Sequence, residues 1–261
     1  MDKVTSRDGT PIAFDRVGEG PPIILVVGAF NDRATGTPLA AALQDRFTVI
    51  TYDRRGRGDS GDTPPYAVER EVEDIEALVE EAGGSAALFG YSSGAVLSLI
   101  GAARGLAISK MALYEPPVTA DGDRGRVRED LAARLTELVE ADHQGDAVAL
   151  FQREGVGLPA EVVAQLRQAP FWPALEAMAH TLVYETQILG DGSLPTELAA
   201  SVETPTLVIA GGESFPYMRE TALALAEVIP EARARVLEGQ THDIVPRALA
   251  PVLEEFFATA S

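Results

Sequence analysis

The sequence contains no cysteine. This absence excludes disulfide bonds, thiolate metal sites and a cysteine nucleophile, and it fits a reducing compartment. No apolar run approaches the roughly 18 residues that would suggest a membrane span. The first residues, Met1–Asp8, lack the apolar segment of a signal peptide. From these absences we expect a cytoplasmic protein without a membrane partner.

Basic residues and histidines are scarce as well. Lysine and arginine number 21 against 40 aspartates and glutamates, for a formal net charge of −19. Such a charge repels phosphate backbones, so we expect no nucleic-acid partner. Of the three histidines, His143, His180 and His242, no pair has metal-ligand spacing. We therefore expect no metal ion and no cofactor.

Short apolar runs alternate with helical patterns in both the first and the last part of the chain. Strands are expected at residues 23–27, 47–51, 86–89, 108–114, 205–210 and 232–237, after a hairpin over residues 4–14. Helices are expected at residues 38–43, 68–81, 218–228 and 252–257. This alternation predicts an α/β fold with a mostly parallel sheet flanked by helices.

Strand patterns stop between Pro117 and Glu203. Helical spacing with intervening prolines takes their place, at residues 131–139, 147–151, 162–166, 175–184 and 194–202. We predict an all-helical cap of residues 117–203, inserted into a core made of residues 1–116 and 204–261.

The most informative stretch joins an apolar strand to a helix through Gly90-Tyr91-Ser92-Ser93-Gly94. The pattern G-x-S-x-G suits a sharp turn because glycine lets the backbones of strand and helix approach closely. Ser92 stands at the tip of this turn. The free N–H groups of the helix that follows favour negative charge beside it. This context is the one in which a nucleophile elbow occurs.

With these features the chain resembles the α/β-hydrolase superfamily. Two further segments carry the resemblance: residues 53–60, which read D-x-R-G-x-G-x-S, and the loop Gly239–His242. The resemblance implies that Ser92 is the nucleophile and His242 the general base and acid. It also implies an oxyanion hole formed by the backbone N–H groups of Ser93 and Ala29. Many relatives carry a histidine where Val27 stands here, but backbone donors do not depend on that side chain.

The acid that orients the histidine is harder to assign. In the superfamily it usually follows the strand that resumes the sheet after the cap. Here Ser214 stands at that place, with Glu213 one position early. A second placement, as in some haloalkane dehalogenases, follows the strand before the cap, where Glu115 precedes two prolines. We prefer Glu115 and keep Glu213 as the alternative; a dyad without a working acid also remains open.

The resemblance implies a serine hydrolase of the esterase kind that cleaves a small-molecule ester, thioester or lactone through an acyl-enzyme on Ser92. The same triad could instead serve perhydrolase, C–C hydrolase or lyase chemistry, and the fold could serve a non-catalytic receptor or scaffold. A small acyl substrate is the expected partner, bound by a monomer or homodimer. Candidate pocket residues are Phe30, Tyr91, Trp172 and Tyr184, with packing inside the cap as the alternative for the cap aromatics.

The loop after the second parallel strand contains three arginines, Arg54, Arg55 and Arg57. They could form an anion site. We interpret them instead as scaffolding that is ion-paired with the acidic residues Asp53 and Asp59 beside them.

Overall fold

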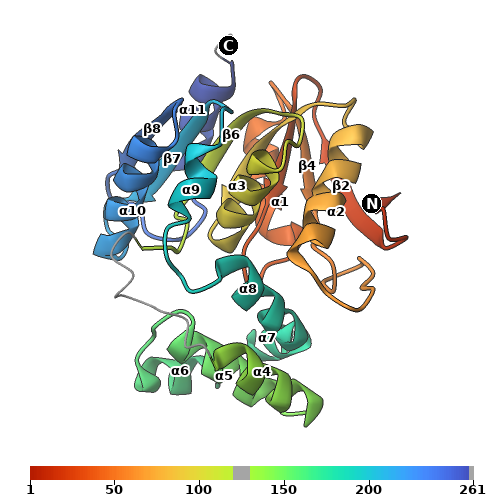
Figure 1. Ribbon diagram of the computed structural model, residues 1–261, viewed down its shortest axis with the longest axis vertical. Helices are drawn as coiled ribbons and strands as arrows, with labels where there is room; N and C mark the ends of the chain where they lie inside the picture. The colour runs from red at the N-terminus through yellow and green to blue at the C-terminus, as the bar shows by residue number, and fades with distance from the viewer. Residues whose placement is uncertain (120–129, 259–261) are drawn as a thin grey trace.

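The computed structural model describes residues 1–119 and 130–258 (Figure 1). Parts of the predicted cap (residues 120–129) and of the predicted core (residues 259–261) therefore lie outside the described residues. One eight-stranded sheet has the order β1-β2-β4-β3-β5-β6-β7-β8. Its strands are β1 (Asp2–Thr5), β2 (Pro11–Val17), β3 (Pro22–Val26), β4 (Thr48–Tyr52), β5 (Ala86–Tyr91), β6 (Ile108–Tyr114), β7 (Thr206–Gly211) and β8 (Ala232–Leu237).

Strand β1 pairs antiparallel with β2, and β2 pairs antiparallel with β4. From β4 onward, through β3, β5, β6 and β7 to β8, neighbouring strands pair parallel. Helices α2 (Val68–Glu81), α3 (Ser93–Ala103) and α10 (Pro216–Val228) pack on one face through one hydrophobic cluster. Helices α1 (Arg33–Leu43) and α11 (Pro246–Ala258) pack on the other face through a second cluster. The predicted α/β fold is thus confirmed. The carboxyl ends of β5, β6, β7 and β8 are followed by the catalytic candidates Ser92, Glu115, Glu213 and His242, respectively.

Two core helices begin earlier than the sequence suggests. Helix α1 begins five residues before Pro38, and the side chain of Asp32 accepts a hydrogen bond from the Ala34 N–H to cap it. Helix α11 likewise contains Pro251 in its interior. A proline inside a helix costs about 3 kcal/mol. Both helices bury apolar side chains against the same face of the sheet, and that burial outweighs the cost.

Between β6 and β7 the described chain is helical. The helices are α4 (Leu131–Glu140), α5 (Gln144–Glu154), α6 (Ala160–Leu166), α7 (Trp172–Ala177), α8 (Leu182–Leu189) and α9 (Thr196–Ala200), with a short 3-10 turn at Ala179–Thr181. The single helix expected over residues 175–184 is therefore three pieces. Helices α4 to α7 stand away from the sheet (Figure 1) and share a small hydrophobic cluster that also includes Ala179 and Leu182. Farther along, Ile188, Leu189, Ala199 and Val202 pack into the core of the sheet instead.

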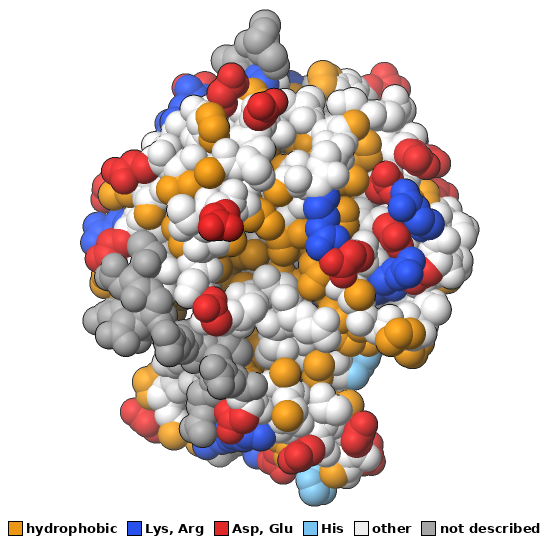
Figure 2. Space-filling model, in the orientation of Figure 1, with side chains coloured by type: hydrophobic (Ala, Val, Ile, Leu, Met, Phe, Trp, Pro, Cys, Tyr) orange, Lys and Arg blue, Asp and Glu red, His pale blue; other side chains and the backbone are white. Residues whose placement is uncertain are grey.

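Acidic side chains lie over both the sheet region and the outer helices on the face that Figure 2 shows. This distribution reflects the excess of aspartate and glutamate in the composition. Across residues 1–119 and 130–258, no helix has the length and apolarity needed to cross a membrane.

Candidate active site

The turn after β5 holds Ser92 in a strained backbone conformation. Its φ is 56° and its ψ is −127°, a backbone conformation that residues other than glycine rarely adopt. The Ser92 N–H donates to the Tyr114 carbonyl at 2.9 Å, and the Ser92 carbonyl accepts from the Ala95 N–H at 2.9 Å. The sheet and the first turn of α3 together hold the strained residue in place. Ser92 is therefore presented at the amino end of α3, as the motif predicts.

The two glycines of the motif are required by close packing. A Cβ atom on Gly94 would lie 2.1 Å from the Val26 carbonyl oxygen, and one on Gly90 would lie 2.6 Å from the Ala95 Cα. Both neighbours are backbone atoms, which cannot swing aside as the end of a side chain can. Strand β3, strand β5 and helix α3 thus meet so tightly that only glycine fits at these positions.

Glu115 lies at the end of β6, fully buried, and its carboxylate faces the histidine loop. One carboxylate oxygen, Oε2, is 2.8 Å from Nδ1 of His242. The other, Oε1, accepts a hydrogen bond from the Gly211 N–H at 2.6 Å. Both oxygens are engaged, which is what burial of a carboxylate requires. The structure therefore brings together the preferred acid and the histidine.

Two tyrosines hold the histidine loop around this pair. The Tyr114 hydroxyl donates to the Thr241 carbonyl and, at 3.3 Å, to the Asp243 carbonyl, the residues on either side of His242. Burial, followed by the charge of Glu115, raises the pKa of Tyr114, so its hydroxyl keeps the proton it donates. The Tyr91 ring centroid lies 5.0 Å from that of His242. Since Tyr91 directly precedes Ser92, the imidazole lies beside the strained turn.

Glu213, the alternative acid, occupies a different environment. Its side chain is exposed in the turn after β7, and its N–H donates to the Gln240 carbonyl at 2.9 Å. Its neighbour Ser214 stands where the resemblance would place the acid, and the Ser214 Oγ is buried with no hydrogen-bond partner within residues 1–119 and 130–258. The carboxylate that contacts His242 is that of Glu115.

The loop after β3 lies against the turn. A Cβ on Gly28 would be 2.8 Å from the Ser92 Cβ, so this loop can approach only because the residue is glycine. The next N–H, that of Ala29, donates to the Ser93 Oγ at 3.1 Å. Ser93 itself is buried. The two residues expected to supply the oxyanion donors are thus in direct contact.

The four candidate pocket residues fall into two groups. Tyr91 directly precedes Ser92, and Phe30 follows Ala29 in the loop after β3. The Phe30 ring stands edge-on to Phe151 of α5, with the ring centroids 5.6 Å apart. Trp172 is buried in the core shared by α4 to α7, where its Nε1 donates to Glu176 at 2.8 Å. Tyr184 stacks on Tyr66 at 3.8 Å. Trp172 therefore has its contacts within the outer helices, whereas Tyr184 contacts the loop before α2.

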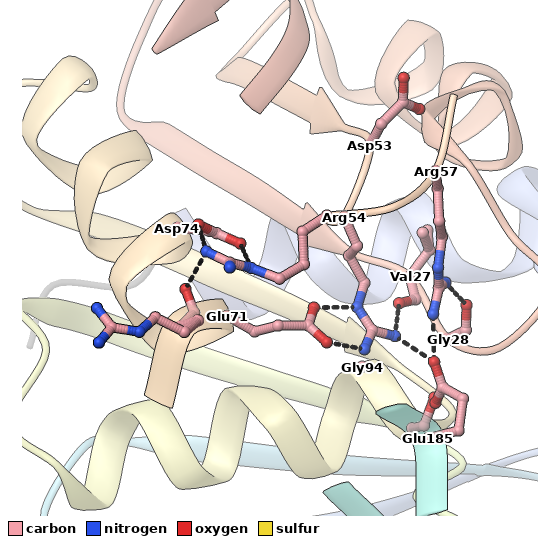
Figure 3. A network of polar contacts seen from close by, with 12 residues as sticks. Val27, Gly28, Asp53, Arg54, Arg57, Glu71, Asp74, Gly94 and Glu185 are labelled. Carbon is pink, nitrogen blue, oxygen red and sulfur yellow. Dashed lines mark hydrogen bonds and ion pairs between the residues drawn. The ribbon is translucent and has the colours of Figure 1, made fainter. Parts of the chain in front are cut away.

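The three arginines are buried and ion-paired, although their partners differ from those expected (Figure 3). Arg54 makes two 2.6 Å hydrogen bonds to Glu71 of α2, and Arg55 binds both oxygens of Asp74 on the same helix. The neighbouring acids Asp53 and Asp59 pair instead with Arg33. Adjacent position in the sequence was therefore a poor guide to the ion pairs.

A glutamate from α8 completes this network. Glu185 accepts hydrogen bonds from Arg54, at 2.8 Å, and from Arg57 through a single oxygen. Burial opposes the charge of Arg54, but Glu185 and Glu71 outweigh it and raise the pKa of that guanidinium. Nothing in the sequence pairs residue 185 with residues 54 and 57, so sequence reasoning missed this contact.

Comparisons with known proteins agree with this architecture. A model of the Alpha/beta hydrolase family matches residues 23–255. The crystal structure of an alpha/beta hydrolase from Sphaerobacter thermophilus DSM 20745 superposes with a TM-score of 0.93 at 55% identity, covering 98% of this chain and 100% of that one.

Two relatives that are named for an activity have more distant sequences. The 3-oxoadipate enol-lactonase 1 of Acinetobacter baylyi is 26% identical over 80% of this chain and 82% of its own length. The 2-(acetamidomethylene)succinate hydrolase of Mesorhizobium japonicum is 28% identical over 86% of this chain and 82% of its own length. Together with the fold and the family match, these relatives support a hydrolase. The chain belongs to the alpha/beta hydrolase family.

Proposed function

We propose that the protein is a serine hydrolase whose catalytic residues are Ser92, His242 and Glu115. The observation that carries the proposal is the 2.8 Å contact between Glu115 and Nδ1 of His242, beside the strained turn that presents Ser92. A serine hydroxyl is a weak nucleophile unless a base removes its proton. An imidazole oriented by a buried carboxylate is the usual solution.

The roles follow from this geometry. Glu115 accepts a hydrogen bond from the Nδ1–H of His242, which fixes the tautomer whose Nε2 is unprotonated and able to act as the base. Nε2 takes the proton of the Ser92 hydroxyl as Oγ attacks the substrate carbonyl. The imidazolium that forms is stabilised by the carboxylate and then protonates the leaving group. Water, activated by the same imidazole, hydrolyses the acyl-enzyme and regenerates Ser92.

The N–H groups of Ala29 and Ser93 are the donors proposed for the oxyanion of the tetrahedral intermediate. Ser93 is the first residue of α3, so its N–H is free of helical hydrogen bonding and lies at the positive end of the helix dipole. The Ala29 N–H is held beside it by the Ser93 hydroxyl. That hydrogen bond occupies the Ala29 N–H in this structure, so the N–H must turn from the Ser93 hydroxyl to the oxyanion, or be shared between the two, when charge develops.

The proposed substrate is a small ester, thioester or lactone. Support comes from relatives named for the hydrolysis of an enol-lactone and of an acetamidomethylene succinate, both small carbonyl compounds. The edge-on pair of Phe30 and Phe151 offers an apolar wall next to Ala29. Phe151 belongs to the helical insertion, which we propose acts as a cap over the site.

A fluorophosphonate probe tests the activated nucleophile directly. We expect one equivalent to attach to Ser92, and labelling to be lost in Ser92→Ala and strongly slowed in His242→Ala. Ser201→Ala, at an exposed serine after α9, is the matched control and should label normally. A folded wild-type protein that resists the probe would contradict the proposal and favour a receptor or scaffold. Labelling without turnover of any ester, thioester or lactone would point to the C–C, lyase or perhydrolase reactions.

A further inference from the structure

The peptide unit between Gly28 and Ala29 is held at both of its polar atoms. Nη1 of Arg57 donates to the Gly28 carbonyl oxygen at 2.6 Å, and to the Asn31 carbonyl oxygen at 3.1 Å. The Ala29 N–H donates to the Ser93 Oγ. In a trans peptide the C=O and N–H point in opposite directions within one plane. Arg57 therefore sets the direction of the N–H on the other side, which is one of the two proposed oxyanion donors.

The guanidinium of Arg57 is itself fixed from the helical insertion. It is buried and pairs with Glu185, whose Oε1 also binds Arg54. Arg54 is anchored by Glu71 and extends Nη1 to the Val27 carbonyl oxygen at 3.3 Å. Figure 3 shows both guanidinium groups reaching toward Glu185 and toward the Val27–Gly28 backbone. Two successive carbonyls of the oxyanion loop are thus bound by one buried ionic cluster.

This cluster is not arranged for stability alone. Arg57 Nε and Glu185 Oε2 are both buried, and neither has a hydrogen-bond partner among the residues that the structure describes. Unpartnered buried polar atoms destabilise a fold, so such an arrangement favours a functional reason for its retention. Burial and the neighbouring charge of Arg54 lower the pKa of Arg57.

The same loop contains a comparison pair without contact to the oxyanion loop. Arg55 is equally buried and binds Asp74 of α2 through two hydrogen bonds of 2.7 and 2.8 Å. Its remaining hydrogen bonds go to Asp8 and to the Arg70 carbonyl. The Arg55–Asp74 pair ties the loop to α2 but does not reach Gly28. It therefore provides a matched control for the effect of losing a buried ion pair.

We propose that Arg57, held by Glu185, is a positioning residue that orients the Gly28–Ala29 peptide for oxyanion binding. Without it the peptide can rotate, because glycine places little restriction on the backbone at position 28. The positive charge of Arg57, which lies against the Gly28 carbonyl oxygen, also polarises the peptide and strengthens the Ala29 N–H as a hydrogen-bond donor. The helical insertion thereby contributes to transition-state stabilisation through Glu185. This inference rests on the proposed serine hydrolase function.

Steady-state kinetics with p-nitrophenyl butyrate on Arg57→Lys, Glu185→Gln and Asp74→Asn test the inference. Loss of one oxyanion donor reduces kcat by about 10²–10³-fold. We expect Arg57→Lys to lower kcat by about 10–10²-fold, with KM changed less than about threefold, because the ground state does not need the oriented N–H. Glu185→Gln, which keeps the shape of the side chain, should give a smaller fall of the same kind. Asp74→Asn should lower the melting temperature but leave kcat within about twofold.

An aryl trifluoromethyl ketone adds a readout that a purely structural role would not change. It forms a tetrahedral adduct with the serine, so its affinity should fall by the same factor as kcat/KM in the Arg57 and Glu185 variants. The corresponding trifluoromethyl alcohol, which forms no adduct, should bind equally well to all variants. A folded Arg57→Lys or Glu185→Gln with unchanged kcat and ketone affinity would overturn the inference.

An equal loss of kcat in Asp74→Asn would also overturn it, by showing that any damage to this loop has the same effect. If Arg57→Lys does not fold, Glu185→Gln decides alone by the same criteria. Failure of the inference leaves fluorophosphonate labelling of the wild type at Ser92 intact. Failure of the proposed function abolishes that labelling, so the two results are distinguishable.

Discussion

Oε2 of Glu115 lies 2.8 Å from Nδ1 of His242, although 127 positions separate the two residues in the chain. The pairing joins the end of β6 to the loop after β8, across the carboxyl end of β7, which lies between them in the sheet. Strand β7 contributes as well, because the Gly211 N–H at its end binds the second carboxylate oxygen. Three neighbouring strand ends thus position one imidazole.

Removing the charge of Glu115 should impair catalysis more than folding. We expect Glu115→Gln to lower kcat by at least about 10²-fold, since a neutral amide neither selects the tautomer of His242 nor stabilises its positive form. Glu213→Gln, at the exposed glutamate in the turn after β7, is the matched control and should stay within about twofold of the wild type. Circular dichroism would confirm the fold of both. Large damage from Glu213→Gln with a benign Glu115→Gln would reverse the assignment.

The proposed position of the acid, after β6 and not after β7, predicts a rescue. The buried Ser214 Oγ lies next to Gly211, since a Cβ on that glycine would be 2.8 Å from it. An aspartate at position 214 should therefore place a carboxylate near the space vacated in Glu115→Ala. We expect Glu115→Ala/Ser214→Asp to recover kcat by at least about tenfold over Glu115→Ala.

The isosteric double variant Glu115→Ala/Ser214→Asn controls for this rescue. It offers the same shape without the charge and should recover nothing. Equal activity of the aspartate and asparagine variants would show that position 214 cannot serve the histidine.

Backbone strain at Ser92 should be measurable in the stability of its variants. An alanine variant is usually more stable than the glycine variant, and strain should reverse this order. At a φ of 56° a Cβ is unfavourable. Ser92→Gly should therefore have a free energy of unfolding about 1 kcal/mol greater than Ser92→Ala. At Ser98, in the interior of α3, the ordinary order should hold, with alanine about 1 kcal/mol more stable than glycine. Urea denaturation of the four variants makes the comparison, and the same order at both sites would argue against strain.

The loss of stability at acidic pH should depend in part on Asp8. Partial burial opposes its charge, but hydrogen bonds from Arg55 and Thr10 outweigh it and lower the pKa of Asp8 to about 2 from 3.8. A lowered pKa in the folded state gives stability that is present above pH 4 and is lost as the pH falls toward 2. The contribution is about 2 kcal/mol. In Asp8→Asn the free energy of unfolding should fall less steeply between pH 4 and 2. Identical slopes for both proteins would contradict the contact with Arg55.

Local patterns in the sequence predicted most of the sheet. Apolar runs located the six parallel strands, and the amphipathic helix over residues 68–81 was predicted with its observed bounds. Pro38 and Pro251 led us to predict that their helices begin too late in the chain. Both prolines lie inside helices, because packing of these helices on the sheet outweighs the local cost of a proline. The helix expected over residues 175–184 failed for a related reason, since one amphipathic pattern spans three short pieces with different contacts.

The order of the motifs along the chain and the positions of the strand ends narrowed the choice of candidate site residues. Glu115 and Glu213 both followed strands, and only coordinates show which carboxylate reaches His242. The contacts of Glu185 with Arg54 and Arg57 were beyond sequence reasoning, because they depend on how the helical insertion packs against the sheet. The contact between Ala29 and the Ser93 hydroxyl depends in the same way on the approach of two loops.

The acyl-enzyme itself is the most direct test of the proposed chemistry. Rapid quenching of the reaction with p-nitrophenyl acetate, followed by peptide mass spectrometry, should show one acetyl group on the peptide that contains Ser92. Its amount should match a pre-steady-state burst of p-nitrophenol, and both should vanish in Ser92→Ala. Turnover of the ester with no acetylated Ser92, or with acetylation at another residue, would contradict the account.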